Sequence, residues 1–445
     1  MKIDGGPLLA RLIEDSLKAG ATAADARFSR SEGIGVAVRG GKLESVERDE
    51  SAGVALRCFV GQRQAHVSGQ DLSDDGLNDL VERCVAMARL APEDRFAGIA
   101  APEELATEGV DLDLVGDPAT TAEALEAEAL EAEAAALAVD GVKQVASCGA
   151  GVSLSERWVA ASNGFAAHRV SGSSSLGLAA IGERDGKMER DYESRQSRYR
   201  EDRPAPAEIG RVAGERTVAR LGARRLATQK AAVIYDRRLA TSLLSALIGA
   251  ISGPAVARGV SFLKDRRGEM VFAPGIHVID DPFRPRGLGS RAHDGEGRAV
   301  SMTRIIEDGR LTDFLLNGPA ARQLGLTPNG FASTSFGDPP GVTTSNLHIE
   351  PGDTTPAEAM KAVGRGLLVT DMFGPSINPN TGDYSVGVAG FWFEAGEIAY
   401  PVSEVTIAGE LPAMFARLRP LSDLEFRGAT NAPSILIEDM SLAGT

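Results

Sequence analysis

The chain has 445 residues, of which 43% are hydrophobic and 24% are charged, and its formal net charge is −15. This length exceeds what one ordinary hydrophobic core holds, so two or three domains are expected, and the composition excludes general disorder. The phosphates of nucleic acid and of anionic membranes repel so acidic a protein, so neither is expected as a partner.

Residues 1–115 predict a first α+β unit. Apolar residues have helical spacing over 8–19, apolar runs follow at 26–28, 34–38 and 54–60, and a second helical pattern covers 74–90. Gly40-Gly41 lies between two of the runs as a turn signal. The first helix contains charged residues, which is not typical of a signal peptide, so no export is expected. A stretch rich in Pro, Gly and acids at 92–118 indicates a connection between domains.

Residues 116–229 predict a second α+β unit. The segment 120–139 is nearly all Ala, Glu and Leu and favours a helix with a solvated acidic side. Strands are expected at 142–152, 158–162 and 166–171, with Asn163-Gly164 as a hairpin signal. The stretch 188–203 carries five arginines, but five acids cancel their charge. We therefore expect a solvated strand or loop there and no nucleic-acid stripe.

Residues 230–445 predict a mainly β domain with a buried helix at its start. The segment 239–257 has no charged residue, but Ser, Thr, Gly and Pro interrupt it, which favours a buried helix over a membrane span. Asp308-Gly309 and Ala395-Gly396 are hairpin signals. The expected fold class is therefore α+β, with domains at 1–115, 116–229 and 230–445.

Common catalytic motifs are missing from the sequence. No serine is framed as Gly-x-Ser-x-Gly, and no Gly-rich loop leads into Gly-Lys-Ser/Thr. The cysteines Cys58, Cys84 and Cys148 form no Cys-x-x-Cys pair, which fits a reducing compartment without disulfides. No two of the five histidines lie within five residues of each other, as a local metal motif would require.

Motifs of the C-terminal half carry a family resemblance. Asp280-Asp281, Gly287, Ser290, Asp294, Gly297 and the run 306–309 resemble a stretch shared by both branches of the TldD/PmbA protease family. The run 378–387 is more specific and, with the motifs at 390–392, 400–402, 406–409 and 427–434, is similar to the PmbA/TldE branch. Glu410 departs from that pattern, where asparagine is expected. The resemblance covers nearly the whole chain.

The resemblance implies that the metal-binding helix of the TldD branch lacks its ligands here. In that branch the helix carries His-Glu-x-x-x-His, and a cysteine near the C-terminus completes the zinc site. The motif falls on residues 244–249, where Leu244, Ser245 and Gly249 replace its three functional residues. The residues agree, because 237–264 contain no His, Cys, Asp or Glu. We expect no catalytic residue and no metal ligand in this chain.

The family also implies partners. TldD and TldE act together on short unfolded peptides, including a bacteriocin precursor and an antitoxin, and an older label calls the family modulators of DNA gyrase. The resemblance implies a non-catalytic cytoplasmic subunit whose TldD-like zinc peptidase homologue holds the zinc, with a homodimer possible when the chain is isolated. The candidates for a peptide groove or interface are Thr381, Gly382, Asp383, Tyr384 and Asn431.

One alternative stays open. The chain could act alone as a metal-dependent peptidase, with ligands drawn from His277, His293, His348 and nearby carboxylates.

Overall fold

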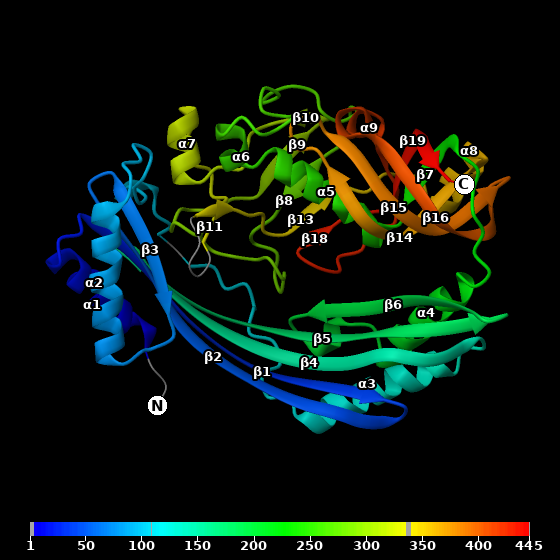
Figure 1. Ribbon diagram of the computed structural model, residues 1–445, viewed down its shortest axis with the longest axis horizontal. Coiled ribbons are helices and arrows are strands. Elements are labelled where there is room, and N and C mark those ends of the chain that lie inside the picture. The colour runs from blue at the N-terminus through cyan, green and yellow to red at the C-terminus, as the bar shows by residue number, and fades with distance from the viewer. Residues whose placement is uncertain (1–3, 108, 335–339, 445) are drawn as a thin grey trace.

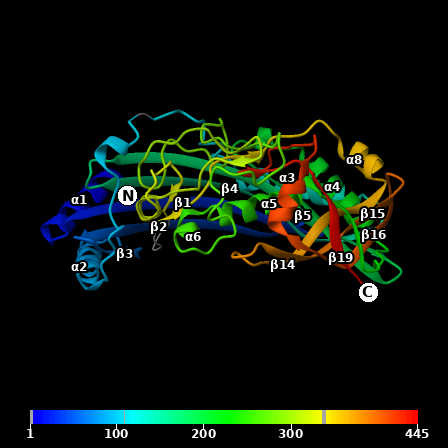
Figure 2. The same cartoon turned by 90° about the horizontal axis from the view of Figure 1, so that it is seen from above.

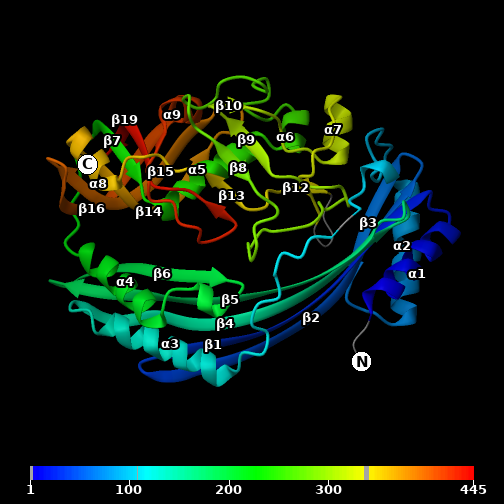
Figure 3. The same cartoon turned by 180° about the vertical axis from the view of Figure 1, so that it is seen from behind.

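The computed structural model describes residues 4–107, 109–334 and 340–444. A long curved sheet forms one layer, and a second, mainly β body lies over its inner face (Figure 1). The view from behind shows the same two layers, with the helices of the first layer on its outer side (Figure 3). Seen from above, the second body extends along the length of the sheet (Figure 2).

The N-terminal sheet has six strands in the order β3-β2-β1-β4-β5-β6, and every neighbouring pair is antiparallel. β1 pairs with β4 from Asp25 opposite Ala161 to Val38 opposite Cys148, so the two expected α+β units share one continuous sheet. The strands are β1 (Ala23–Arg39), β2 (Lys42–Val60), β3 (Arg63–Gly69), β4 (Val142–Ala161), β5 (Ala166–Arg184) and β6 (Lys187–Ser197).

Four helices cover the outer side of this sheet. Leu9, Leu12 and Leu80 of the first two helices pack with Phe28 and Val54 of the strands to form one core. A second core lies under the other two helices, which approach so closely that a Cβ on Gly210 would lie 2.0 Å from the Ala132 carbonyl oxygen. The helices are α1 (Gly5–Lys18), α2 (Asp74–Leu90), α3 (Ala122–Leu137) and α4 (Pro206–Ala219), and 3-10 turns lie at Pro102–Glu104 and Arg200–Asp202.

The C-terminal domain, residues 229–444, contains a barrel. Its main sheet has the order β16-β15-β14-β7-β19-β17, and an additional pairing of β16 with β19 closes the ring. Only the β14–β7 pairing in it is parallel. The strands are β7 (Gln229–Tyr235), β14 (Arg365–Ile377), β15 (Asp383–Glu394), β16 (Glu397–Glu410), β17 (Arg419–Pro420) and β19 (Ile435–Ala443).

A second sheet of this domain has the order β10-β9-β8-β13-β18, and a small hairpin joins β11 to β12. These short strands are β8 (Val278–Asp280), β9 (Thr303–Glu307), β10 (Arg310–Leu311), β11 (Ala332–Ser333), β12 (Gly341–Val342), β13 (Leu347–Ile349) and β18 (Thr430–Asn431). The helices are α5 (Arg237–Ala250), α6 (Gly253–Ala257), α7 (Gly318–Leu324), α8 (Pro356–Val363) and α9 (Leu411–Arg417).

Helix α5 starts directly after β7 and belongs to the main core of the domain. Leu243, Leu244 and Leu247 are each at most 1% exposed. Ser245 and Gly249 are exposed, so the buried helix expected at the start of this domain is buried on one side only. One side faces the barrel core and the other carries small residues. No helix in the described ranges is long and apolar enough to span a membrane.

The α+β fold class is confirmed, and so are the four turn signals. Hairpin turns join β1 to β2 at Gly40-Gly41, β4 to β5 around Asn163-Gly164, β9 to β10 at Asp308-Gly309, and β15 to β16 at Ala395-Gly396. The arginine-rich stretch is strand β6, as one of the two expected forms. It is not simply solvated, because Asp191 and Glu193 are buried beneath the C-terminal domain and ion-paired there.

Candidate functional site

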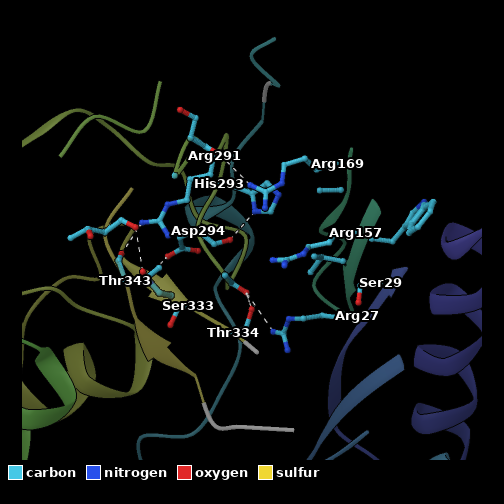
Figure 4. A pocket seen from close by; sticks show the side chains of 18 of the residues that line it. Arg27, Ser29, Arg157, Arg169, Arg291, His293, Asp294, Ser333, Thr334 and Thr343 are labelled. Carbon is cyan, nitrogen blue, oxygen red and sulfur yellow. Dashed lines mark hydrogen bonds between the residues drawn. The ribbon is translucent and has the colours of Figure 1, made fainter. Parts of the chain in front are cut away.

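A cavity of about 430 Å³ lies where the N-terminal sheet meets the C-terminal domain. Figure 4 shows arginines extending from the strands on one side toward loops of the C-terminal domain on the other. Its charged and hydroxyl-bearing lining consists of Arg27, Ser29, Arg157, Arg169, Ser290, Arg291, His293, Asp294, Ser333, Thr334, Thr343 and Thr344. We call this the arginine cavity.

Strand alternation brings the sheet's arginines to the cavity. In β1, Ala26 and Phe28 point to the outer helices, where they join the core, so Arg27 between them points to the inner face. Arg27 forms an ion pair with Asp25 at 3.1 Å. β4 and β5 follow the same rule, with Trp158 packed against the outer core and Arg157 and Arg169 on the inner side.

Arg157 and Arg169 lie directly opposite each other on β4 and β5. Like charges in that position destabilise a sheet. Arg169 donates a hydrogen bond to the Ser290 carbonyl oxygen at 3.3 Å, whereas Arg157 is exposed. Burial, together with the charges of Arg157, Arg198 and Arg291, lowers the pKa of Arg169 to about 10. This wall of the cavity is therefore strongly cationic.

Asp294 holds the opposite wall in place. The Asp294 carboxylate accepts hydrogen bonds from the backbone N–H groups of Glu296 (2.8 Å), Arg298 (2.9 Å) and Ala332 (3.3 Å). The residue is 1% exposed, and burial raises the pKa of its carboxyl to about 6. Its oxygens are occupied by the loop, so Asp294 shapes the cavity more than it neutralises the arginines.

Arg291 and His293 complete this wall. Arg291 donates to the carbonyl oxygens of Gly330 (3.2 Å) and Thr343 (3.0 Å), and its buried Nε has no hydrogen-bond partner in the described structure. The His293 ring lies edge-on to Phe165, and its Nδ1 lies 2.7 Å from the Asp294 carbonyl oxygen. Burial lowers the pKa of His293, so the imidazole is mostly neutral near pH 7.

The positions aligned with the metal motif lie elsewhere, on α5. Leu244 is buried in the barrel core, while Ser245 and Gly249 face outward. The Ser245 hydroxyl donates to the Thr241 carbonyl oxygen at 3.1 Å. Leucine and glycine side chains offer no donor atom, so these three residues do not fit a zinc ion.

Asn431 lines a second pocket, of about 240 Å³, between β6 and the start of α5. Its side-chain oxygen accepts from the backbone N–H groups of Arg427 (2.7 Å) and Gly428 (3.1 Å), so it braces the loop before β18. Tyr192, Arg238 and Thr241 also line this pocket. Asn431 is thus close to the aligned helix, although its own polar groups are engaged in the fold.

The other predicted groove candidates lie before and in β15, in a different sheet from Asn431. Thr381 and Asp383 are exposed and hydrogen-bond to each other at 2.6 Å. Gly382 adopts φ +82°, and Tyr384 is 4% exposed in the barrel core. The five candidates therefore do not form one cluster.

The three histidines of the alternative prediction have separate surroundings. His277 accepts from the backbone N–H of Asp308 at 3.2 Å, His293 lines the arginine cavity, and His348 lies edge-on to Phe426. Within residues 4–107, 109–334 and 340–444, no three His, Cys, Asp or Glu side chains are grouped to hold a metal. The ligand set expected for a stand-alone metallopeptidase is not assembled in the described structure.

The curved sheet with outer helices and the barrel domain over its inner face define a three-domain α+β protein. Family models match as PmbA/TldA metallopeptidase domain 1 at residues 24–88, central domain at 116–221 and C-terminal domain at 228–444. The chain belongs to the PmbA/TldD family, in its PmbA branch.

Its relatives cover almost the full length. It is 36% identical to metalloprotease PmbA of Escherichia coli O157:H7 over 425 residues, 95% of this chain and 92% of that protein. It is 31% identical to the metalloprotease PmbA homolog of Haemophilus influenzae over 436 residues, 97% and 94% of the two chains. TldE from Thermococcus kodakarensis has the same fold, with TM-score 0.87, 20% identity, and 98% and 99% of the chains covered.

Sequence reasoning missed the arginine cavity. Arg27, Arg157 and Arg169 come from three strands, and Arg291 comes from a loop of another domain. Alternation within each strand could have shown which residues share a face. No signal in the sequence indicates the pairing of strands and domains that brings these faces together.

Proposed function

We propose that this chain is the subunit without a metal site in a PmbA/TldD-type peptidase assembly. Its partner is a TldD-like zinc homologue that carries the His-Glu-x-x-x-His helix, and the assembly processes small unfolded peptides. The observation that carries the proposal is α5, where Leu244 is built into the core at the first aligned position and Gly249 offers no side chain at the last.

Two further observations support this proposal. The cysteines Cys58, Cys84 and Cys148 are all buried in the N-terminal part of the chain, so none can complete a site beside α5. The barrel core around α5 is well packed with leucines. Close packing of this helix is expected in a subunit that still needs a stable fold to bind its partner.

The proposal assigns distinct roles to parts of the chain. The domains at 1–115, 116–229 and 230–445 form the frame, and the exposed turn with Thr381 and Asp383 is a candidate contact for the partner. Asn431, beside the second pocket, is a candidate for the peptide path. An extended peptide can add to an exposed strand edge, a common mode of peptide recognition.

The test is native purification of the tagged chain from its own host, followed by identification of co-purifying proteins and zinc analysis of each. We expect a homologue with the His-Glu-x-x-x-His helix to co-purify and to carry about one zinc per chain. The separated tagged chain should hold no stoichiometric zinc and should cleave no unstructured peptide.

The two relatives are named metalloproteases, which favours a second candidate, a metallopeptidase that acts alone. The same zinc analysis separates the two functions. About one zinc per separated tagged chain, lost in His277→Ala or His293→Ala, would establish the second candidate and contradict the first.

A further inference from the structure

We propose that the arginine cavity binds a carboxylate of the peptide substrate. The inference rests on the proposed function, which gives an unfolded peptide as the substrate class. It adds which chemical group of that peptide this chain binds. The terminal carboxylate of a peptide and an acidic side chain share this chemistry, and the experiment below distinguishes them.

The charges of the cavity are its main support. Arg157 and Arg169 face each other across β4 and β5, Arg291 approaches from the other domain, and Arg27 lies beside them (Figure 4). Asp25 pairs with both Arg27 and Arg57, and in the described part of the chain neither Arg157 nor Arg169 forms an ion pair. A bound anion would remove the repulsion between these two guanidinium groups.

This arrangement is unusual for the molecule. The chain has 62 acidic residues against 47 Lys and Arg, so acids are abundant. Elsewhere under the same domain, a single buried acid, Glu193, pairs with three arginines, Arg195, Arg216 and Arg427. Because these cationic groups lie opposite each other in the cavity without a carboxylate partner among the described residues, they are free to bind an added anion.

The lining favours a carboxylate on a peptide. The planar fork of a guanidinium matches the two oxygens of a carboxylate, and hydroxyl groups of Ser29, Ser333 and Thr334 add possible donors. Val159, Ala167 and Leu288 provide apolar surface for the adjoining residues of a chain. The volume falls within the roughly 300–1,000 Å³ typical of small-ligand pockets. The net charge of −15 repels a long polyanion. A single carboxylate in the cavity interacts mainly with the arginines around it.

The test is calorimetric titration of the purified full chain at pH 7 with three short N-acetylated peptides of alanine, glycine and serine. One has a free C-terminus, one is its C-terminal amide, and one is the amide with a central glutamate. We expect at least one carboxylate peptide to bind at least about tenfold more tightly than the neutral amide, because hydrogen bonds to charged groups are the strong ones. Preference for the first peptide identifies the terminal carboxylate, and preference for the third identifies a side chain.

Variants locate the binding. Arg157→Ala with Arg169→Ala should weaken carboxylate binding by at least about tenfold, and Arg169→Lys should lose part of it because the fork is absent. Arg83→Ala on α2 removes one positive charge from an exposed position remote from the cavity lining and should leave binding unchanged. Circular dichroism and thermal unfolding of each variant would show that it is folded.

Four results would overturn the inference. The first is equal binding of all three peptides, the second is equal carboxylate binding by the folded double variant, and the third is binding of inorganic phosphate with no carboxylate binding. Absence of any binding at millimolar peptide would also overturn it. The titration uses this chain alone, so it stands apart from co-purification of the homologue, which tests the proposed function.

Discussion

Asp294 shows how one buried carboxylate can set a wall of the cavity. Three backbone N–H groups converge on its oxygens, and two of them belong to the same loop. Asp294→Ala leaves these donors without a partner in a buried place. We expect it to lower the free energy of unfolding by roughly 2 kcal/mol or more, measured by chemical denaturation.

The same residue predicts a pH effect. Its folded-state pKa, about 6, is raised above the ordinary value of 3.8, so the native state binds this proton more tightly than the unfolded chain. Its contribution to stability is fully present below about pH 4 and is lost as pH rises through about 6. Relative to Asp294→Asn, the wild type should gain on the order of 2 kcal/mol between pH 7 and pH 4.5. A constant difference between the two proteins over that range would refute the assignment.

The arginine pair explains why the cavity could not be predicted. A two-residue turn centred on Asn163-Gly164 would place Arg157 opposite Val170. The structure has a longer connection, in which Ala160 pairs with Ala166 and Arg157 pairs with Arg169. A register change of one residue moves side chains to the other face of a strand. The hairpin was therefore predictable from sequence, whereas the charge cluster was not.

At the scale of elements, amphipathic helices and turns were predictable and strand lengths were not. Two apolar runs, 26–28 and 34–38, belong to one strand, β1, which also includes the polar residues between them. β1 pairs on both sides with β2 and β4, so backbone hydrogen bonds hold its polar middle in the sheet. Such pairing depends on distant segments, which no local pattern contains.

Helix α5 offers a prediction with an internal control. Leu247 is 0% exposed in the barrel core, so Leu247→Ala should cost roughly 2–5 kcal/mol. Gly249 is exposed on the same helix, with open space where a Cβ would be built. Gly249→Ala should therefore stabilise the protein by about 0.5–1 kcal/mol. Chemical denaturation of both variants checks this. A loss well below 1 kcal/mol for Leu247→Ala would contradict the packing described for α5.

At the scale of the whole molecule, buried ion pairs fix the C-terminal domain over the sheet. Glu193 of β6 is 2% exposed and pairs with Arg427 of the C-terminal domain, and Asp191 pairs with Arg238 at 3.1 Å. Arg198 donates to the Gly172 carbonyl oxygen in the N-terminal sheet and to the Leu288 carbonyl oxygen across the same boundary. Removing one member of such a pair leaves a buried charge, so these contacts define one arrangement of the two bodies.

In the proposed function, this fixed arrangement serves as a preformed frame for a catalytic partner. Its inner surface carries the arginine cavity and the second pocket, while the helix aligned with the metal motif carries Leu244, Ser245 and Gly249. The proposal places a catalytic homologue beside this frame. Stable pairing of the two would bury roughly 2,000 Å² or more, as obligate partners do.

Reconstitution with the homologue tests the partner-subunit proposal. Purified chain and the homologue that carries the His-Glu-x-x-x-His helix are mixed at micromolar concentration, followed by size exclusion and by hydrolysis of an unstructured peptide. We expect the two chains to elute together and the mixture to cleave the peptide, whereas this chain alone leaves it intact. Separate elution, together with equal activity of the homologue with and without this chain, would contradict it.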